Sequence, residues 1–483
     1  MKRAKKFLAR GALTLLIGAA LLYIPDCEDE FEGAAEGEPF VWNQDAVWDA
    51  LAARFARAKT QGCHALSIAI REEIQALGHA LDDLETRPPT PGDARLNAYE
   101  ERFFRTAAEV AACTSYARDL VDVHSRMRTI VKDASADWDL DQRGARGRLY
   151  RLLYGGRMAI EEVLLQIDED APVLARGQDE PSGAPSTEIR GVRVHSGDIL
   201  VSRGGAPTSA LIARGNDYPG NFSHIALAHV DEDGTFQTIE AHIEVGVVVA
   251  GLERYENDPK LRVMLLRPRE SLGGVAHAAA EHALSEAKAR HIPYDFAMNY
   301  EDDAQQFCSE VASSAYRAQN VSLWQGLTSM SSPATARWLH AFGVRNFVTH
   351  GPSDLEYDPQ LVVVAEWRDA DTLFQDHVDS AVIDAMLEGA AAGDEVKHSQ
   401  AMLPLARLIK AWSVVKNLFG AAGPVPEGMS ATVGLRAQWL RENHRRLAAK
   451  VRESATLFQE EHGHRPPYWE LVRMANEARN TGS

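Results

Sequence analysis

The chain has 483 residues, of which 45% are hydrophobic and 25% are charged, and its formal net charge is −18. This composition predicts a packed globular protein of two or three units and excludes a largely disordered chain. Because a strongly acidic surface is repelled by phosphate backbones, nucleic acid is excluded as a partner.

The N-terminus carries a dense basic cluster, followed by an apolar stretch over residues 11–24. A basic start before a short apolar run is typical of a secretory signal. The run is shorter than the roughly 20 residues of a full membrane span, but no clear small-residue cleavage site follows it. We therefore expect residues 1–30 to be a signal peptide or an uncleaved N-terminal membrane anchor. Both alternatives predict an exported protein, either periplasmic or anchored in the inner membrane and facing the periplasm.

Apolar residues at helical spacing predict a helical region over residues 40–175. A Pro- and Gly-rich break at 88–92 separates two of its helices. Cys63 and Cys113 both fall in this region, and an exported protein could join them in a disulfide, although their spacing does not establish the geometry. The four cysteines have no C-x-x-C spacing, so neither a zinc site nor any other cofactor is expected.

A linker rich in Pro, Ser and Gly is predicted over residues 177–187. Short β-rich segments follow it, with a helix over 275–289 and a second helix that begins near Gln306. Strands in a run with helices beside them predict an α+β domain over residues 190–350. The predicted strands cover residues 198–201, 222–230, 236–241, 245–249 and 261–266.

Residues 365–483 are predicted to form a C-terminal helical region. Part of it carries an apolar helix face that includes Leu405, Leu408, Trp412 and Val415. Ordinary helix packing is the favoured interpretation of this face. The alternative is a surface suited to a membrane-borne substrate.

Cys308 begins an amphipathic helix in the segment Phe307-Cys308-Ser309-Glu310. A cysteine in the first turn of a helix faces the positive end of the helix dipole, which favours the nucleophilic thiolate. Cys308 is therefore the candidate nucleophile. The alternative is a small buried side chain without a chemical role.

His224 lies in an apolar segment typical of a buried strand, where it is either a core residue or a general base. Glu240 lies on the next predicted strand, and one register makes it a near-diagonal neighbour of His224 on the same face. Glu240 would then accept a hydrogen bond from His224 and orient the ring. The other register turns Glu240 and His242 to the opposite face. His242 and Asp198 are the alternative orienting residues.

Several short motifs occur in one order along residues 190–350, about a third of the chain. They are Gly197-Asp198-Ile199-Leu200, Ser223-His224, Ile239-Glu240-Ala241, Gly246-Val247-Val248 and Tyr294-Asp295-Phe296 followed by Phe307-Cys308-Ser309-Glu310. In this order the chain resembles the YiiX-like and YebB-like permuted papain-fold amidases, relatives of the NlpC-type cell-wall peptidases. The resemblance implies a permuted papain-like fold, which explains why the histidine precedes the cysteine. It also implies that Cys308 is the nucleophile, His224 the base and Glu240 the orienting residue.

The expected function is therefore hydrolysis of an amide bond through a thioester. Because the protein is expected to be exported, the expected substrate is an amide or peptide, with peptidoglycan-derived peptide as the candidate. Two alternatives stay open. One is a lipid acyltransferase or phospholipase of the same fold, and the other is a non-catalytic binding module.

Overall fold

The structure is a computed structural model, and it describes residues 22–24, 26, 30–42, 45–167, 173–418 and 423–481. Most of the predicted signal or anchor, including nearly all of the apolar run 11–24, lies outside the described residues. Within the described ranges, no helix combines the length and the apolar character needed to cross a membrane.

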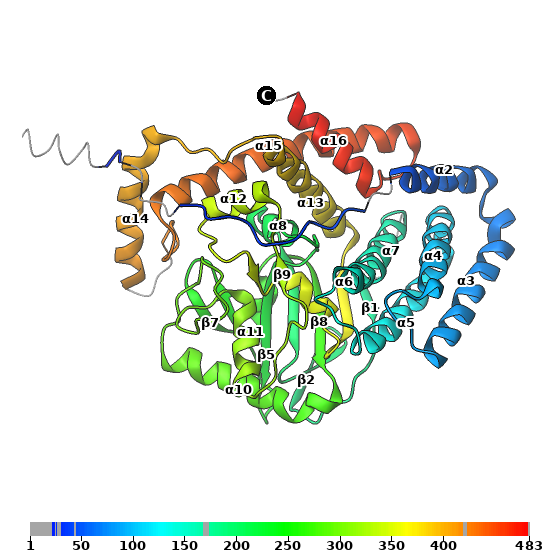
Figure 1. The fold of residues 1–483 in the computed structure, drawn as a ribbon, viewed down its shortest axis with the longest axis horizontal. Helices are drawn as coiled ribbons and strands as arrows, with labels where there is room; N and C mark the ends of the chain where they lie inside the picture. Colours follow the sequence, from blue (N-terminus) through cyan, green and yellow to red (C-terminus); the bar gives the residue numbers. More distant parts are fainter. Residues whose placement is uncertain are drawn as a thin grey trace, which may run out of the picture.

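A seven-stranded antiparallel sheet lies in the middle of the molecule (Figure 1). Its strand order is β1-β11-β8-β4-β5-β6-β7. The strands are β1 (Leu174–Arg176), β4 (Ile199–Gly204), β5 (His224–Val230), β6 (Phe236–His242), β7 (Gly246–Gly251), β8 (Lys260–Pro268) and β11 (Leu361–Arg368). Two short ladders join β2 (Ser186–Ile189) to β3 (Val192–His195) and β9 (Thr328–Ser329) to β10 (Val348–Thr349). Helices combined with an antiparallel sheet confirm the predicted α+β class.

Both faces of the sheet are buried. The helices α10 (Gly273–Ala289) and α11 (Cys308–Arg317) pack on one face, against residues such as Ile225 and Leu227 of β5. On the other face, Ala226 and Ala228 of β5 share a core with Val194 of the β2–β3 hairpin. Alternate residues of β5 therefore enter different cores, which is why residues 225–228 of this strand form a continuous apolar run.

Helices precede the sheet in the chain, as predicted for residues 40–175. They are α2 (Asp45–Gln61), α3 (Cys63–Thr86), α4 (Ala94–Ala112), α5 (Ala117–Ser135), α6 (Arg143–Tyr150) and α7 (Gly156–Leu164). The break at 88–92 falls between α3 and α4. Asp93 caps α4, because its side chain accepts a hydrogen bond from the Arg95 N–H at 2.9 Å.

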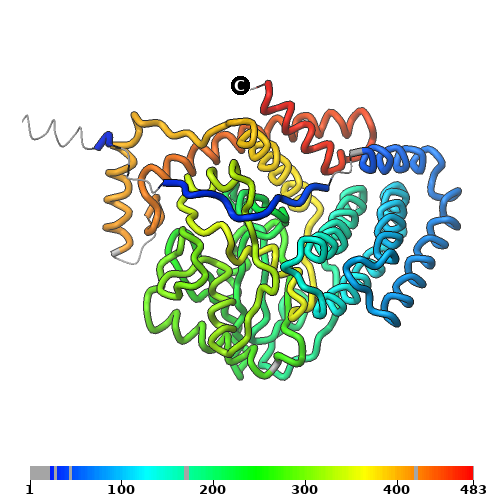
Figure 2. Tube along the Cα trace, in the orientation of Figure 1, coloured from blue at the N-terminus to red at the C-terminus, as the bar shows by residue number. Residues whose placement is uncertain are grey.

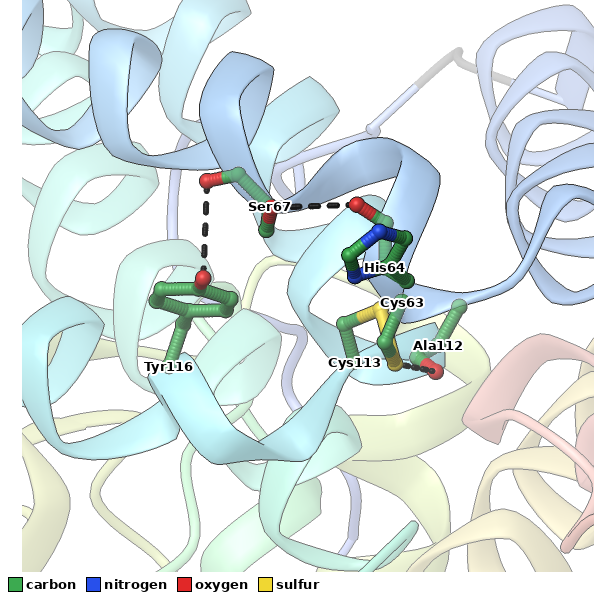
Figure 3. Close-up of a disulfide and its surroundings, with 6 residues drawn as sticks. All are labelled: Cys63, His64, Ser67, Ala112, Cys113 and Tyr116. Carbon is green, nitrogen blue, oxygen red and sulfur yellow. Dashed lines mark hydrogen bonds between the residues drawn. A yellow bond between two sulfur atoms is a disulfide. The ribbon is translucent and has the colours of Figure 1, made fainter.

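Cys63 and Cys113 form a disulfide that joins the start of α3 to the end of α4 (Figure 3). Their Cα atoms are 5.2 Å apart. Nearby, the Tyr116 hydroxyl donates to the Ser67 carbonyl at 3.4 Å. The pairing that the sequence left open is therefore present, and it closes the α3–α4 hairpin.

Replacing both cysteines by serine is expected to lower the free energy of unfolding of the helical region by as much as about 4 kcal/mol. The disulfide closes a loop whose ends are 50 residues apart, and the stabilisation comes chiefly from the restricted unfolded chain. Urea unfolding followed by circular dichroism measures the effect. A reductant should lower the midpoint of the parent and leave that of the Cys63→Ser/Cys113→Ser variant unchanged. Equal midpoints for the parent and the variant would contradict the prediction.

Buried ion pairs join the N-terminal helices to the sheet and the loops around it. Their side chains are at most 7% exposed. The pairs are Arg128–Glu366, Arg146–Asp354, Arg157–Glu356 and Glu161–Arg262. A buried charge is tolerable only when it is paired. Because each of these pairs has one partner in the N-terminal helices and the other in the sheet or its loops, separating the two regions would leave buried charges unpaired.

Helices of the C-terminal region lie along one edge of the molecule (Figure 1). They are α13 (Ala370–Ala391), α14 (Leu403–Leu418), α15 (Ala431–His462) and α16 (Tyr468–Asn480). Three of them, α13, α15 and α16, share a core with two short helices from the middle of the chain, α8 (Pro207–Arg214) and α12 (Pro333–Ala341). The first of the four, α13, also carries Asp376, which pairs with Arg262 of β8 at 2.7 Å.

Residues 30–42 run as an extended strap across the molecule, from the neighbourhood of α14 to the start of α2 (Figure 2). The Phe31 ring packs edge-on against His340 and Phe347, and the Phe40 ring packs against Tyr150. The Ala35 N–H donates to the Met330 carbonyl at 3.1 Å. The strap therefore connects regions that are far apart in the sequence.

The boundaries of the predicted regions need two corrections. The strand β11, residues 361–368, lies inside the sheet between β1 and β8, whereas the sequence assigned 365–483 to helices and ended the α+β domain at 350. The predicted linker 177–187 packs on the protein, because Gly177 N–H donates to the Val364 carbonyl at 2.8 Å and Arg267 donates to the Glu180 carbonyl at 2.8 Å. Both features depend on partners that are remote in the sequence.

Candidate active site

Cys308 is the first residue of α11, two residues after the start predicted from the sequence. It is 4% exposed, and its sulfur lies 3.8 Å from the Ser223 carbonyl at the beginning of β5. Glu310 supports this helix start, because its side chain accepts a hydrogen bond from the Phe307 N–H at 2.9 Å. The first N–H groups of a helix lack acceptors within the helix, so those of α11 can serve a bound ligand.

His224 is the first residue of β5 and directly follows Ser223, whose carbonyl contacts the Cys308 sulfur; interaction with Cys308 raises the pKa of the His224 ring. On the other side, Nε2 lies 2.8 Å from Oε2 of Glu240. Since Nε2 is engaged with the carboxylate, Nδ1 is the nitrogen left for the sulfur. The residues that the sequence proposed as nucleophile, base and orienter therefore lie side by side in one row.

The strand register brings Glu240 to this place. Leu227 of β5 pairs with Ile239 of β6, so Glu240 faces position 226 and is a diagonal neighbour of His224. This is one of the two registers that the sequence left open. Thr238 lies two residues earlier on the same face of β6, and its hydroxyl donates to Oε1 of Glu240 at 2.6 Å. Both oxygens of the buried carboxylate are therefore hydrogen-bonded.

The alternative orienting residues lie in different positions. The Nε2 atom of His242 is 3.7 Å from Oε2 of Glu240, so the rings of His224 and His242 approach the same carboxylate oxygen. Asp198 is instead paired with Arg267, at 2.9 Å between Oδ2 and Nη2, and accepts the His195 N–H. Asp198 thus has a structural role, and Glu240 holds the position beside His224.

Burial and hydrogen bonding act in opposite directions on the pKa values of this cluster. Burial alone lowers the pKa of His224, but its hydrogen bonds with Cys308 and Glu240 outweigh burial and raise the pKa to about 10. Burial raises the pKa of Glu240, but the hydrogen bonds from His224 and Thr238 lower it to about 2. The pKa of His242 is lowered, by burial and then by the neighbouring charge of His224. At neutral pH, His224 is therefore the protonated imidazole and Glu240 the carboxylate.

Tyr294 belongs to the cluster, although no role was predicted for it beyond its motif. Burial, together with the charge of Cys308, raises the pKa of Tyr294 well above its ordinary value, so the phenol keeps its proton. The residues around it pair with the segment before Cys308, because Gln306 N–H donates to the Pro293 carbonyl at 3.0 Å. No hydrogen bond of the Tyr294 hydroxyl is found among the described residues, so this donor is available to a bound substrate.

Glycines in two of the motifs let the surrounding elements approach closely. Gly246 has a φ of +74°, and a Cβ there would lie 2.1 Å from the Ile292 carbonyl oxygen. The neighbouring Val247 N–H donates to that same oxygen at 2.9 Å, which fixes the loop that carries Tyr294. Gly197, with a φ of +93°, likewise allows close contact with the Ala276 carbonyl of α10.

Two groups of side chains in the described residues could hold a metal ion. One consists of His224, Glu240 and His242, so a bound metal would occupy the same ring nitrogen that orients the base. The other consists of His229, His277 and Glu281, in which Ser196 also contacts His277 Nδ1 at 2.8 Å. His229 lies at the other end of β5 from His224, so the second group is separate from the cysteine cluster.

Comparison with known proteins adds no assignment. The sequence matches no protein-family model, and a comparison with curated proteins found no match.

Proposed function

We propose that this protein is a cysteine hydrolase that cleaves an amide bond through a thioester intermediate. The proposal depends on one observation, the row of contacts from the Cys308 thiol through the His224 ring to the Glu240 carboxylate. A thiol beside an imidazole, which is itself oriented by a carboxylate, is the arrangement of a nucleophile, an acid–base group and an orienting group. A permuted papain-like fold, as implied by the motif order, is part of the same proposal.

In the proposed reaction, His224 takes the proton of the Cys308 thiol, and the resulting thiolate attacks the amide carbonyl carbon and forms a tetrahedral oxyanion. The N–H groups at the start of α11 and the Tyr294 hydroxyl are donors for this oxyanion. The C–N bond breaks as His224 gives its proton to the leaving amine, which leaves a thioester. Neutral His224 then takes a proton from water, the hydroxide attacks the thioester, and the C–S bond breaks to release the acid and the thiolate.

The proposed substrate is a peptide amide of the cell wall. This choice follows from the basic and apolar N-terminus, which predicts export to the periplasm or to the periplasmic face of the inner membrane. Solvent reaches the site over the imidazoles, since the side chains of His224 and His242 are 19% and 25% exposed. A substrate would therefore approach over the β6–β7 side of the sulfur.

A second candidate function is cleavage of a lipid ester by the same residues. The observation that favours it is the exposed apolar face of α14, where Leu408 is 61% exposed and Trp412 is 59% exposed. The sequence favoured ordinary packing for this face, and the structure contradicts that prediction for both residues. One purified sample, assayed on peptidoglycan fragments and on phospholipid vesicles, separates the two candidates. Activity on neither substrate, together with no labelling by a thiol-directed probe, would favour a non-catalytic binding module.

Replacing Glu240 by glutamine is expected to lower kcat/KM on the order of 10²-fold, as for loss of a group that positions a proton transfer. The parent should lose activity as pH rises through about 10, because His224 then loses the proton that the leaving amine needs. Glu240→Gln removes a cause that raises the pKa of His224, so its alkaline limit should move to lower pH. The measurement is kcat/KM against pH.

His242→Asn is the matched control, because the His242 ring approaches the same carboxylate oxygen but stays beyond hydrogen-bonding distance, at 3.7 Å. It should keep the alkaline limit close to that of the parent. An unchanged profile in Glu240→Gln would show that Glu240 does not orient the base.

A further inference from the structure

The helix α14 is attached to the rest of the protein by a narrow strip. Leu403 and Ala406 are buried against Ala431 and Leu435 of α15. Ser413 is also buried, and its hydroxyl accepts a hydrogen bond from the Val425 N–H at 3.1 Å. The other side of the helix has no packing partner among the described residues.

Large apolar side chains line that unpacked side. Leu405, Leu408, Trp412 and Val415 follow one another at spacings of three, four and three residues, and each is more than 40% exposed. Such spacing places them on a single helix face. Arg407, Lys410 and Lys416 are the charged residues of α14, which contains no Asp or Glu. A helix with an apolar face, a tryptophan and only basic charges has the chemistry of a helix that lies in a membrane interface.

The N-terminal segment is held against α14. Arg407 of α14 donates to the Ile24 carbonyl and pairs with Asp26 at 2.9 Å. Asp26 also accepts the N–H and the hydroxyl of Thr432, at 3.1 and 2.7 Å, and so caps α15. The chain is therefore fixed beside α14 at the point where the apolar run 11–24 ends.

We propose that α14 is an interfacial membrane-binding helix, and that its exposed apolar face lies on the phospholipid bilayer into which residues 11–24 insert. Two residues of extended chain span at most about 7 Å, so an anchor that ends at Ile24 holds the bilayer surface next to Arg407. One short apolar anchor alone gives weak attachment, and a second apolar and basic element makes it stable. The protein as a whole has a negative net charge, whereas the charged residues of α14 are all basic. An anionic membrane surface therefore attracts α14 more than the other faces of the protein.

This docking would bring the cysteine cluster near the membrane. Lys410 of α14 donates to the carbonyls of Pro426 and Glu427, both at 2.6 Å. The Glu427 side chain pairs with His291 at 2.8 Å, in the loop that carries Tyr294. A continuous chain of contacts thus leads from the proposed membrane-binding helix to the site. The membrane proposal itself does not require that site to be catalytic.

The test uses the full chain bound to vesicles of phosphatidylethanolamine and phosphatidylglycerol with brominated acyl chains, which quench tryptophan within the bilayer. The chain has nine tryptophans. We expect quenching in the parent and loss of most of it in Trp412→Phe, which preserves the apolar face. The matched control is Trp469→Phe, on α16, whose ring stacks on Trp48. This control should keep the quenching of the parent.

A second variant tests the face without removing the reporter. Leu408→Asp/Val415→Asp should stay on the vesicles through its N-terminus but lose the Trp412 quenching, whereas Leu457→Asp, at a residue of α15 that is 59% exposed, should not. Equal tryptophan quenching in the parent and in Trp412→Phe would overturn the proposal. It would also be overturned if the parent bound to the vesicles in a flotation assay but its tryptophan fluorescence were not quenched. A dimer that dissociates in Leu408→Asp/Val415→Asp, without lipid quenching in the parent, would overturn it too and assign the face to a second copy.

Discussion

Replacing Cys308 by alanine is expected to abolish amide hydrolysis, with a loss of about 10⁶-fold in kcat, as for removal of a triad nucleophile. The same variant should lose probe labelling at position 308, read by peptide mapping that separates it from Cys27, since Cys308 is the free cysteine of the described residues. Its stability should fall by only about 1 kcal/mol, because a single buried sulfur is removed. The measurements are single-turnover amide cleavage, probe labelling and thermal unfolding.

Ser309→Ala is the matched control for this variant. Ser309 follows Cys308 on the same helix turn, is fully buried, and its hydroxyl has no hydrogen-bond partner. Removing that hydroxyl should leave both hydrolysis and labelling unchanged. Cys308→Ser keeps the size of the side chain and should also be inactive, because a serine beside His224 lacks the acidity of a thiol. Activity that survives in both Cys308 variants would eliminate the proposed mechanism.

Replacing Glu161 by alanine is expected to lower the free energy of unfolding by about 3–5 kcal/mol, the largest stability effect that we predict for a single residue. Glu161 lies on α7 and is fully buried. Its oxygens contact Arg262 of β8, with Nη2 at 3.0 Å, and His377 of α13, with Nε2 at 2.9 Å. Removing the carboxylate deprives the His377 ring of this partner. It also takes one of two carboxylates from Arg262, which keeps Asp376, and from the buried Arg157, which keeps Glu356.

The control for this prediction is Glu101→Ala on α4. Glu101 also pairs with an arginine, Arg105, one turn further along the same helix, but the two side chains are 73% and 43% exposed. Exposed pairs of this kind contribute well under 1 kcal/mol. Chemical denaturation of both variants measures the contrast, and similar midpoints for Glu161→Ala and the parent would show that the buried network does not hold the three regions together.

The elements that carry the site could be predicted from local patterns. The strands at 222–230 and 236–241, the helix after Gln306 and the break at 88–92 all appear close to their expected places. These features depend on residue type and on periodicity over a few residues, which the sequence contains directly. The two candidate residues His224 and Cys308 could be singled out from a histidine within an apolar segment, a cysteine at a helix start and the order of the motifs around them.

Contacts between distant segments could not be predicted in this way. Local patterns allowed two registers between β5 and β6, and the pairing of Leu227 with Ile239 selects the one that places Glu240 beside His224. Thr238 could have been found from its position two residues before Glu240, but only once the register was known. Tyr294 stood in a motif without a role, because its closeness to the sulfur depends on the loop held by Gly246.

By itself, the sequence determined the α+β class, the export signal or anchor as a prediction, and the residue types needed for a cysteine hydrolase. Only the tertiary structure decided that β11 enters the sheet, that Glu161 joins three regions, and that the face of α14 is left exposed. The physical reason is that periodicity determines which residues share a face, whereas the partner of that face comes from elsewhere in the chain. Burial, ion pairing and pKa values depend on that partner, so they appear only when the whole chain is folded.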